Sequence, residues 1–134
     1  MSTQTLEDIF GPVISSYSRA EAIGDGTLAD VTSMARQAGF KFPVAMTRAA
    51  WEECVTIPKG VTGQDEAGRL WDVLYMLHCA VKRGQGGQRT DFSLYVRTSN
   101  RERLTGRDLV RLKALCGPGD AGEPVITIMQ PGED

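Results

Sequence analysis

Apolar residues recur at helical spacing over residues 62–83, the longest patterned stretch of the chain. Thr62-Gly63-Gln64-Asp65 has the form of a near capping box, and Gly84 ends the pattern. The spacing predicts one long, mostly buried helix, with Arg69 on the polar stripe opposite its apolar face. The apolar face comprises Ala67, Leu70, Trp71, Leu74, Leu77, His78 and Val81, widened by Val73, Met76 and Ala80.

Alternation with period two indicates strands elsewhere in the chain. Residues 92–97 and 110–116 alternate apolar and polar side chains, whereas residues 125–129 are apolar on both faces, as in a central strand. Residues 40–46 also alternate, and Pro43 predicts an edge position for that strand because proline cannot donate to a ladder. Residues 28–31 are expected to form a further short strand.

Short helices are expected before the long one. Ser18-Arg19-Ala20-Glu21 matches a capping box, Gly39 can end a helix over residues 33–38, and Thr47 can cap a helix reaching Val55. Residues 12–17 are expected to be extended and residues 1–8 disordered. The sequence therefore predicts a single α+β domain over residues 1–134, with short N-terminal helices and one long buried helix on an antiparallel sheet of about three to five strands.

The composition is that of an ordinary globular protein, with 41% apolar and 24% charged residues. The three cysteines are far apart in the sequence and lie among apolar neighbours, which indicates reduced thiols in a cytoplasmic protein rather than disulfides. The N-terminus lacks an apolar signal core, and no segment is apolar enough to span a bilayer. No association with a membrane is expected.

Positive charge is concentrated in residues 82–113, although the net charge of the chain is −2. Guanidinium groups bind phosphate and carboxylate groups bidentately, and arginine is enriched in interface hot spots. We therefore expect a partner-binding surface there; a solvated hairpin rich in arginine is the alternative interpretation. The candidate residues are Arg97, Arg101, Arg103, Arg107 and Arg111.

The chain offers few residues for catalysis or metal binding. His78 is the only histidine, so a two-histidine metal site is excluded. Its helical neighbour Cys79 points elsewhere, which disfavours a histidine-activated nucleophile. The place of His78 on the apolar face predicts a hydrogen-bonded core histidine. Residues 84–87 are rich in glycine but follow a helix and precede a strand, which is typical of a connector rather than a phosphate cradle. We expect no metal site and no cofactor.

Five stretches of the chain are distinctive: Val13-Ile14-Ser15-Ser16-Tyr17-Ser18-Arg19-Ala20-Glu21-Ala22-Ile23, Phe42-Pro43-Val44-Ala45, Gly68-Arg69-Leu70-Trp71-Asp72-Val73-Leu74, Cys116-Gly117-Pro118-Gly119-Asp120 and Glu123-Pro124-Val125-Ile126-Thr127-Ile128-Met129. They resemble an uncharacterised family of small bacterial proteins encoded on plasmids, integrative elements and phages. The resemblance covers nearly the whole chain and implies no established activity. Accessory genes of such elements often encode inhibitors of host defence, including anti-CRISPR and antirestriction proteins, that act by stoichiometric binding.

A second resemblance points to an enzyme. Residues 17–28 are similar to the first motif of small ADP-ribosyltransferases, in which a late Glu acts on the ribose of NAD. This resemblance implies an NAD site with Tyr17, Asp25 and Glu123 as its catalytic residues. The usual His or Arg of that motif is not clearly present.

The function expected from these observations is non-enzymatic binding in the cytoplasm of a bacterial host. The expected partner is a host protein or a nucleoprotein complex, and nucleic acid itself is a possible partner. A DNA-binding regulator is a further alternative, although no helix carries a basic recognition stripe. No pattern in the sequence indicates an oligomeric state.

Overall fold

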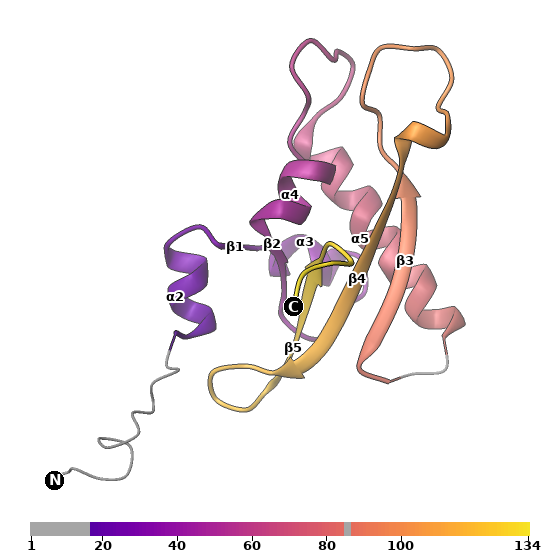
Figure 1. Cartoon of the computed structure of the whole chain (residues 1–134). Coiled ribbons are helices and arrows are strands. Elements are labelled where there is room, and N and C mark those ends of the chain that lie inside the picture. Colours follow the sequence, from indigo (N-terminus) through magenta and orange to yellow (C-terminus); the bar gives the residue numbers. More distant parts are fainter. Residues whose placement is uncertain (1–16, 85–86) are drawn as a thin grey trace, which may run out of the picture.

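The computed structural model describes residues 17–84 and 87–134, and it shows a five-stranded mixed sheet with a long helix, α5 (Glu66–Arg83), behind one face (Figure 1). The α+β prediction is confirmed. The expectations for residues 1–8 and 12–16 lie outside the described residues, as do residues 85–86 of the glycine-rich connector.

The strand order is β1-β2-β5-β4-β3. The strands are β1 (Leu28–Asp30), β2 (Val44–Thr47), β3 (Arg89–Tyr95), β4 (Leu109–Pro118) and β5 (Pro124–Met129). The prediction of an antiparallel sheet is wrong for one pair, because β5 runs parallel to β2 with Val44 opposite Ile126. The other three pairs are antiparallel. The central position predicted for residues 125–129 is confirmed, since β5 lies between β2 and β4.

The edge position predicted for the strand near Pro43 is wrong. Strand β2 begins at Val44, so the missing N–H of Pro43 lies just outside the strand. The Pro43 carbonyl accepts a hydrogen bond from the Ile126 amide at 2.9 Å, which joins this segment to β5. Val44, Ala45 and Met46 are all fully buried, as expected of an interior strand.

Helix α5 is amphipathic rather than mostly buried. Its buried side chains lie on one face, whereas Trp71, Tyr75 and Val81 are exposed. The helix begins one turn later than the Thr62 motif suggests, because Asp65 is the N-cap and accepts a hydrogen bond from the Gly68 amide at 3.1 Å. The buried set is Arg69, Leu70, Val73, Leu74 and Leu77.

From residue 17 onward, three short helices precede α5: α2 (Arg19–Gly24), α3 (Thr32–Gln37) and α4 (Arg48–Cys54). Ser18 and Glu21 form the capping box of α2, and the Thr47 side chain caps α4 by accepting from the Ala50 amide. Asp120 of the β4–β5 loop and Arg19 of α2 hold α2 against the sheet. The Asp120 carboxylate accepts from the Arg19 and Ala20 amides, and the Arg19 guanidinium donates to the Ile126 carbonyl at 2.8 Å.

The two faces of the sheet are covered to different extents. Successive side chains of a strand point to opposite faces, so buried Leu94 and Leu112 face α5, whereas their strand neighbours Ser93 and Arg111 face outward. Helix α2 and residues 130–134 cover the outer face along β5 and β2, where Lys113 donates to the carbonyl groups of Pro131 and Glu133. Much of the outer face of β3 and β4 stays exposed.

Leu74→Ala tests the packing of α5 against the sheet. Leu74 is fully buried, so truncation should lower the free energy of unfolding by about 2–5 kcal/mol through lost apolar contact and the cavity left behind. Chemical denaturation measures this change. Tyr75→Ala is the matched control, because the neighbouring Tyr75 is exposed and its loss should change stability by no more than about 0.5 kcal/mol. Equal effects of the two substitutions would contradict the assigned orientation of α5.

Candidate functional site

The arginine-rich loop between β3 and β4, residues 96–108, stands beside the α4–α5 loop, residues 55–65, at the top of Figure 1. Asn100 joins the two loops. Its side-chain oxygen accepts from the Thr62 amide at 3.0 Å, and its side-chain nitrogen donates to the Gly60 carbonyl at 2.9 Å. The two loops therefore form one continuous surface at this end of the molecule.

A buried carboxylate organises the β3–β4 loop from inside. Asp108 ends a short 3-10 helix, η1 (Gly106–Asp108), and is only 1% exposed. Its carboxylate accepts hydrogen bonds from the Thr98 hydroxyl at 2.6 Å, the Thr105 amide at 2.7 Å and the Arg101 guanidinium at 3.0 Å. Its backbone carbonyl accepts from the Val96 amide at 2.7 Å. One side chain thus fixes both arms of the loop.

These donors also set the ionisation of Asp108. The hydrogen bond from the Thr98 hydroxyl, followed by that from the Thr105 amide, holds the pKa of the Asp108 carboxyl well below its usual range. Burial acts in the opposite direction, and the Arg101 guanidinium adds to the lowering of the pKa. The carboxylate is therefore charged at neutral pH, and its charge is bound within the loop.

Arg69 links α5 to the β3–β4 loop and to the α4–α5 loop. It is 5% exposed, and its Nε donates to the Cys54 carbonyl at 3.1 Å. Its Nη1 donates to the Gln64 side chain at 3.2 Å and to the Arg97 carbonyl at 2.9 Å. The expected place of Arg69 on the polar stripe opposite the apolar face is wrong, because Arg69 is buried and donates to carbonyl oxygens of Cys54, Gln64 and Arg97. Burial lowers the pKa of this guanidinium.

The five predicted partner-binding arginines divide into two groups. Arg97 donates to the Ser99 and Arg101 carbonyls, and Arg101 forms an ion pair with Asp108 at 3.0 Å, so both are partly buried within the loop. The others are exposed and form no ion pair among residues 17–84 and 87–134. We call these three, Arg103, Arg107 and Arg111, the arginine surface.

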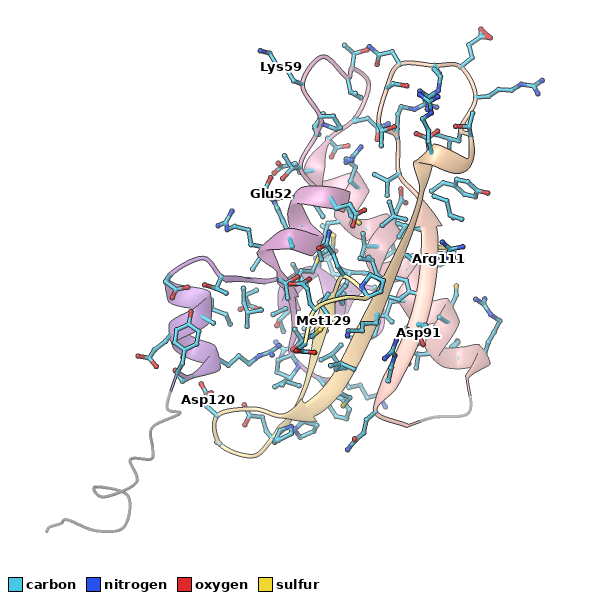
Figure 2. The ribbon with its side chains drawn as sticks, viewed as in Figure 1. Glu52, Lys59, Asp91, Arg111, Asp120 and Met129 are labelled. Carbon is cyan, nitrogen blue, oxygen red and sulfur yellow. The ribbon has the colours of Figure 1, made fainter. Side chains whose placement is uncertain are left out.

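An exposed aromatic residue, Tyr95, lies next to the arginine surface and was not singled out as a site residue from the sequence. It is 55% exposed at the end of β3, directly opposite Leu109 of β4. Arg111 is two residues along β4 and lies opposite Ser93, so Tyr95 and Arg111 are diagonal neighbours on the outer face. Figure 2 shows Arg111 and Asp91 on the β3–β4 side of the sheet, apart from Asp120 near α2.

The three residues of the ADP-ribosyltransferase resemblance are only partly brought together. The Tyr17 hydroxyl donates to the Asp25 carboxylate at 2.5 Å, and both residues are exposed. The Glu123 carboxylate accepts from the Ala121 amide at 2.9 Å within the β4–β5 loop. The shallow cavity lined by Glu123, of about 190 Å³, is lined by Arg19 rather than by Tyr17 or Asp25.

The lone histidine and the buried cysteine occupy packing positions. His78 is half-buried and meets the ring of Phe40 edge-to-face, with 5.5 Å between centroids, so the expectation of a core histidine is wrong. Burial raises the pKa of the Cys54 thiol to about 12, which leaves it protonated and a poor nucleophile. Within the described residues, His, Cys, Asp and Glu side chains do not gather in groups of three or more that could hold a metal ion.

Comparison with known proteins gives one match. The family described as "Family of unknown function (DUF6573)" matches residues 8–134. The chain belongs to this family. Neither the curated proteins nor the solved structures gave a match. The DUF6573 assignment agrees with the predicted resemblance to an uncharacterised family. Among the described helices of this DUF6573 chain, none has the length and apolar character needed to cross a membrane.

Asp108→Asn tests the role of the buried carboxylate through pH. The folded-state pKa is depressed, so the stabilisation is fully present above the unfolded pKa of about 3.9 and is lost as the pH falls through the folded value. The variant should be less stable than wild type at pH 7, and the difference should shrink below about pH 4. Urea denaturation across this range measures it. Glu102→Gln, on the same loop but exposed, should leave the stability at pH 7 nearly unchanged.

Arg69→Lys tests the link from α5 to the two loops. A single ammonium cannot reproduce the planar fork that reaches three oxygen acceptors, so the free energy of unfolding should fall by about 1.5–3 kcal/mol. Chemical denaturation measures the change, with the exposed Arg83→Lys as control. Equal stability of Arg69→Lys and wild type would show that the bonds of Arg69 contribute nothing measurable.

Proposed function

We propose that this chain is a non-enzymatic binding protein that engages an anionic host protein or nucleoprotein complex through the arginine surface. The observation that carries the proposal is the division of charge within the β3–β4 loop and the adjoining start of β4. Asp108 is bound internally by Arg101, whereas Arg103, Arg107 and Arg111 face solvent without a described carboxylate partner. Their charge is therefore available to an external group.

The shape of the loop supports recognition of a macromolecule. Asp108 is bonded to other residues of the loop, and Asn100 is bonded to the neighbouring α4–α5 loop. Because these bonds already order the β3–β4 loop, it loses less conformational entropy when a partner binds. Leu104, which is 42% exposed, adds an apolar side chain between Arg103 and Thr105. Arginine beside exposed apolar and aromatic side chains is the composition expected of an interface.

The biological setting is part of the same proposal. The resemblance to proteins of bacterial plasmids, integrative elements and phages supports an accessory role for this protein in a mobile genetic element. In the cytoplasm of the host it acts as a stoichiometric inhibitor of a defence complex, of the anti-CRISPR or antirestriction type. Such complexes handle nucleic acid, and a preorganised cationic surface can contact either their acidic protein surfaces or their nucleic acid.

The test reverses the charge of the arginine surface as a unit, with Arg103, Arg107 and Arg111 all changed to Glu. Arg101 is left in place because a carboxylate there would face buried Asp108. Affinity capture from a lysate of the bacterial host, followed by mass spectrometry, should show at least about a tenfold loss of the specific partner, since like charges oppose each other at the interface. The thermal midpoint should stay within a few degrees of wild type.

The matched control carries the same change of charge elsewhere. Arg36, Lys41 and Arg83 are exposed and lie on or beside α3 and at the end of α5, away from the β3–β4 loop. The triple Glu variant at these positions should retain the partner. Equal retention of the partner by both triple variants would show that the arginine surface is not the contact.

A further inference from the structure

Much of the outer face of β3 and β4 is not covered by any other described segment, and this face includes Arg111 of the arginine surface. Arg89, Asp91, Ser93 and Tyr95 of β3 and Arg111 of β4 are exposed, and Leu109 is half-buried. We call these six residues the open strip. Helix α2 and residues 130–134 cover the outer face further along, over β5 and beside Lys113. The open strip is therefore a sheet face that remains accessible among the described residues.

The charge of the open strip differs between its two ends. Far from the loop, Arg89 forms an ion pair with Asp91 at 2.9 Å, so the two charges offset each other. Near the loop, Arg111 has no described carboxylate partner, and Arg107 precedes Leu109 by two residues. Tyr95 pairs with Leu109, which lies in sequence between Arg107 of η1 and Arg111 of β4. This end of the strip is both aromatic and cationic.

We propose that this end of the open strip binds single-stranded nucleic acid, with a base stacked on Tyr95 and the backbone phosphates on Arg107 and Arg111. A strand of this kind presents flat, apolar bases and a row of negative charges. An exposed ring beside guanidinium groups on an accessible sheet face meets both requirements. The assignment rests on the proposed function, because it names the class of anionic partner that the arginine surface meets.

An acidic protein surface fits the open strip less well. Acidic groups could pair with Arg107 and Arg111, but they would leave the exposed ring of Tyr95 without a matching partner. Duplex nucleic acid would also meet the arginines, but its bases are already stacked and would not reach the ring. The role of Tyr95 therefore separates the three classes of partner.

The experiment measures fluorescence anisotropy of labelled single-stranded DNA and RNA oligonucleotides of about 20 nucleotides with the full chain at low salt. Tyr95→Ala should weaken binding by about 5- to 100-fold through loss of base stacking, whereas Tyr95→Phe should retain it. Tyr75→Ala is the matched control, because Tyr75 is 53% exposed on α5, the element behind the other face of the sheet. Arg111→Gln should reduce the dependence of log K on log salt by about 0.7.

Each outcome decides a separate point. Binding that Tyr95→Ala leaves unchanged, or that is as tight for a duplex of the same sequence, would overturn the stacking site and leave only phosphate contacts. No binding of any oligonucleotide, together with loss of a captured protein on reversal of the arginine surface, would overturn this inference while supporting the proposed function with a protein partner. Loss of neither the oligonucleotide nor the captured partner on that reversal would overturn both. A preference between the DNA and RNA oligonucleotides would identify the strand.

Discussion

The buried carboxylate of Asp108 is the constraint on which the functional end of this molecule depends. A charged group that is 1% exposed is stable only when polar donors replace water, and here the donors come from both arms of the β3–β4 loop. The loop therefore has one arrangement in which Asp108 is fully bonded. Arg101 takes part in that arrangement and Arg97 donates to carbonyl groups within the loop, whereas Arg103 and Arg107 are exposed.

The α5–sheet framework gives this loop a fixed base. Buried side chains such as Leu74 hold α5 against the core face of the sheet. Arg69 of α5 then donates hydrogen bonds to the carbonyl groups of Cys54 and Arg97, which ties the two loops to the helix. Asn100 then joins the two loops. The packed core, buried Arg69 and buried Asp108 therefore connect the sheet and α5 to the surface loops. A surface ordered in this way loses less entropy on binding than a mobile loop of the same charge.

Local signals in the sequence were sufficient for the elements but not for their arrangement. Ser18 with Glu21 and Thr47 cap helices as their patterns indicate, because a cap involves only neighbouring residues. The apolar character of β5 on both faces correctly indicates a central strand. The parallel pairing of β5 with β2 could not be predicted, because a period of two carries no information about strand direction.

In the candidate site, too, the sequence indicates the residues but not how they are arranged. The cluster of arginines is visible in the sequence, but which of them are bound internally depends on Asp108, whose burial is a tertiary property. The contacts of Arg69 come from residues up to 28 positions away, so helical spacing alone places it on a solvated stripe. Tyr95 and Arg111 become neighbours only through the register of β3 against β4. Long-range contacts of this kind are not encoded in the local pattern.

The most direct measurement is hydrogen exchange of the backbone amides, followed by mass spectrometry, in the chain alone and in its affinity-captured complex. The account predicts new protection confined to residues 95–111, with α2 and the exposed side of α5 unchanged. Protection on α2 or α5, with residues 95–111 exchanging as in the isolated chain, would contradict it.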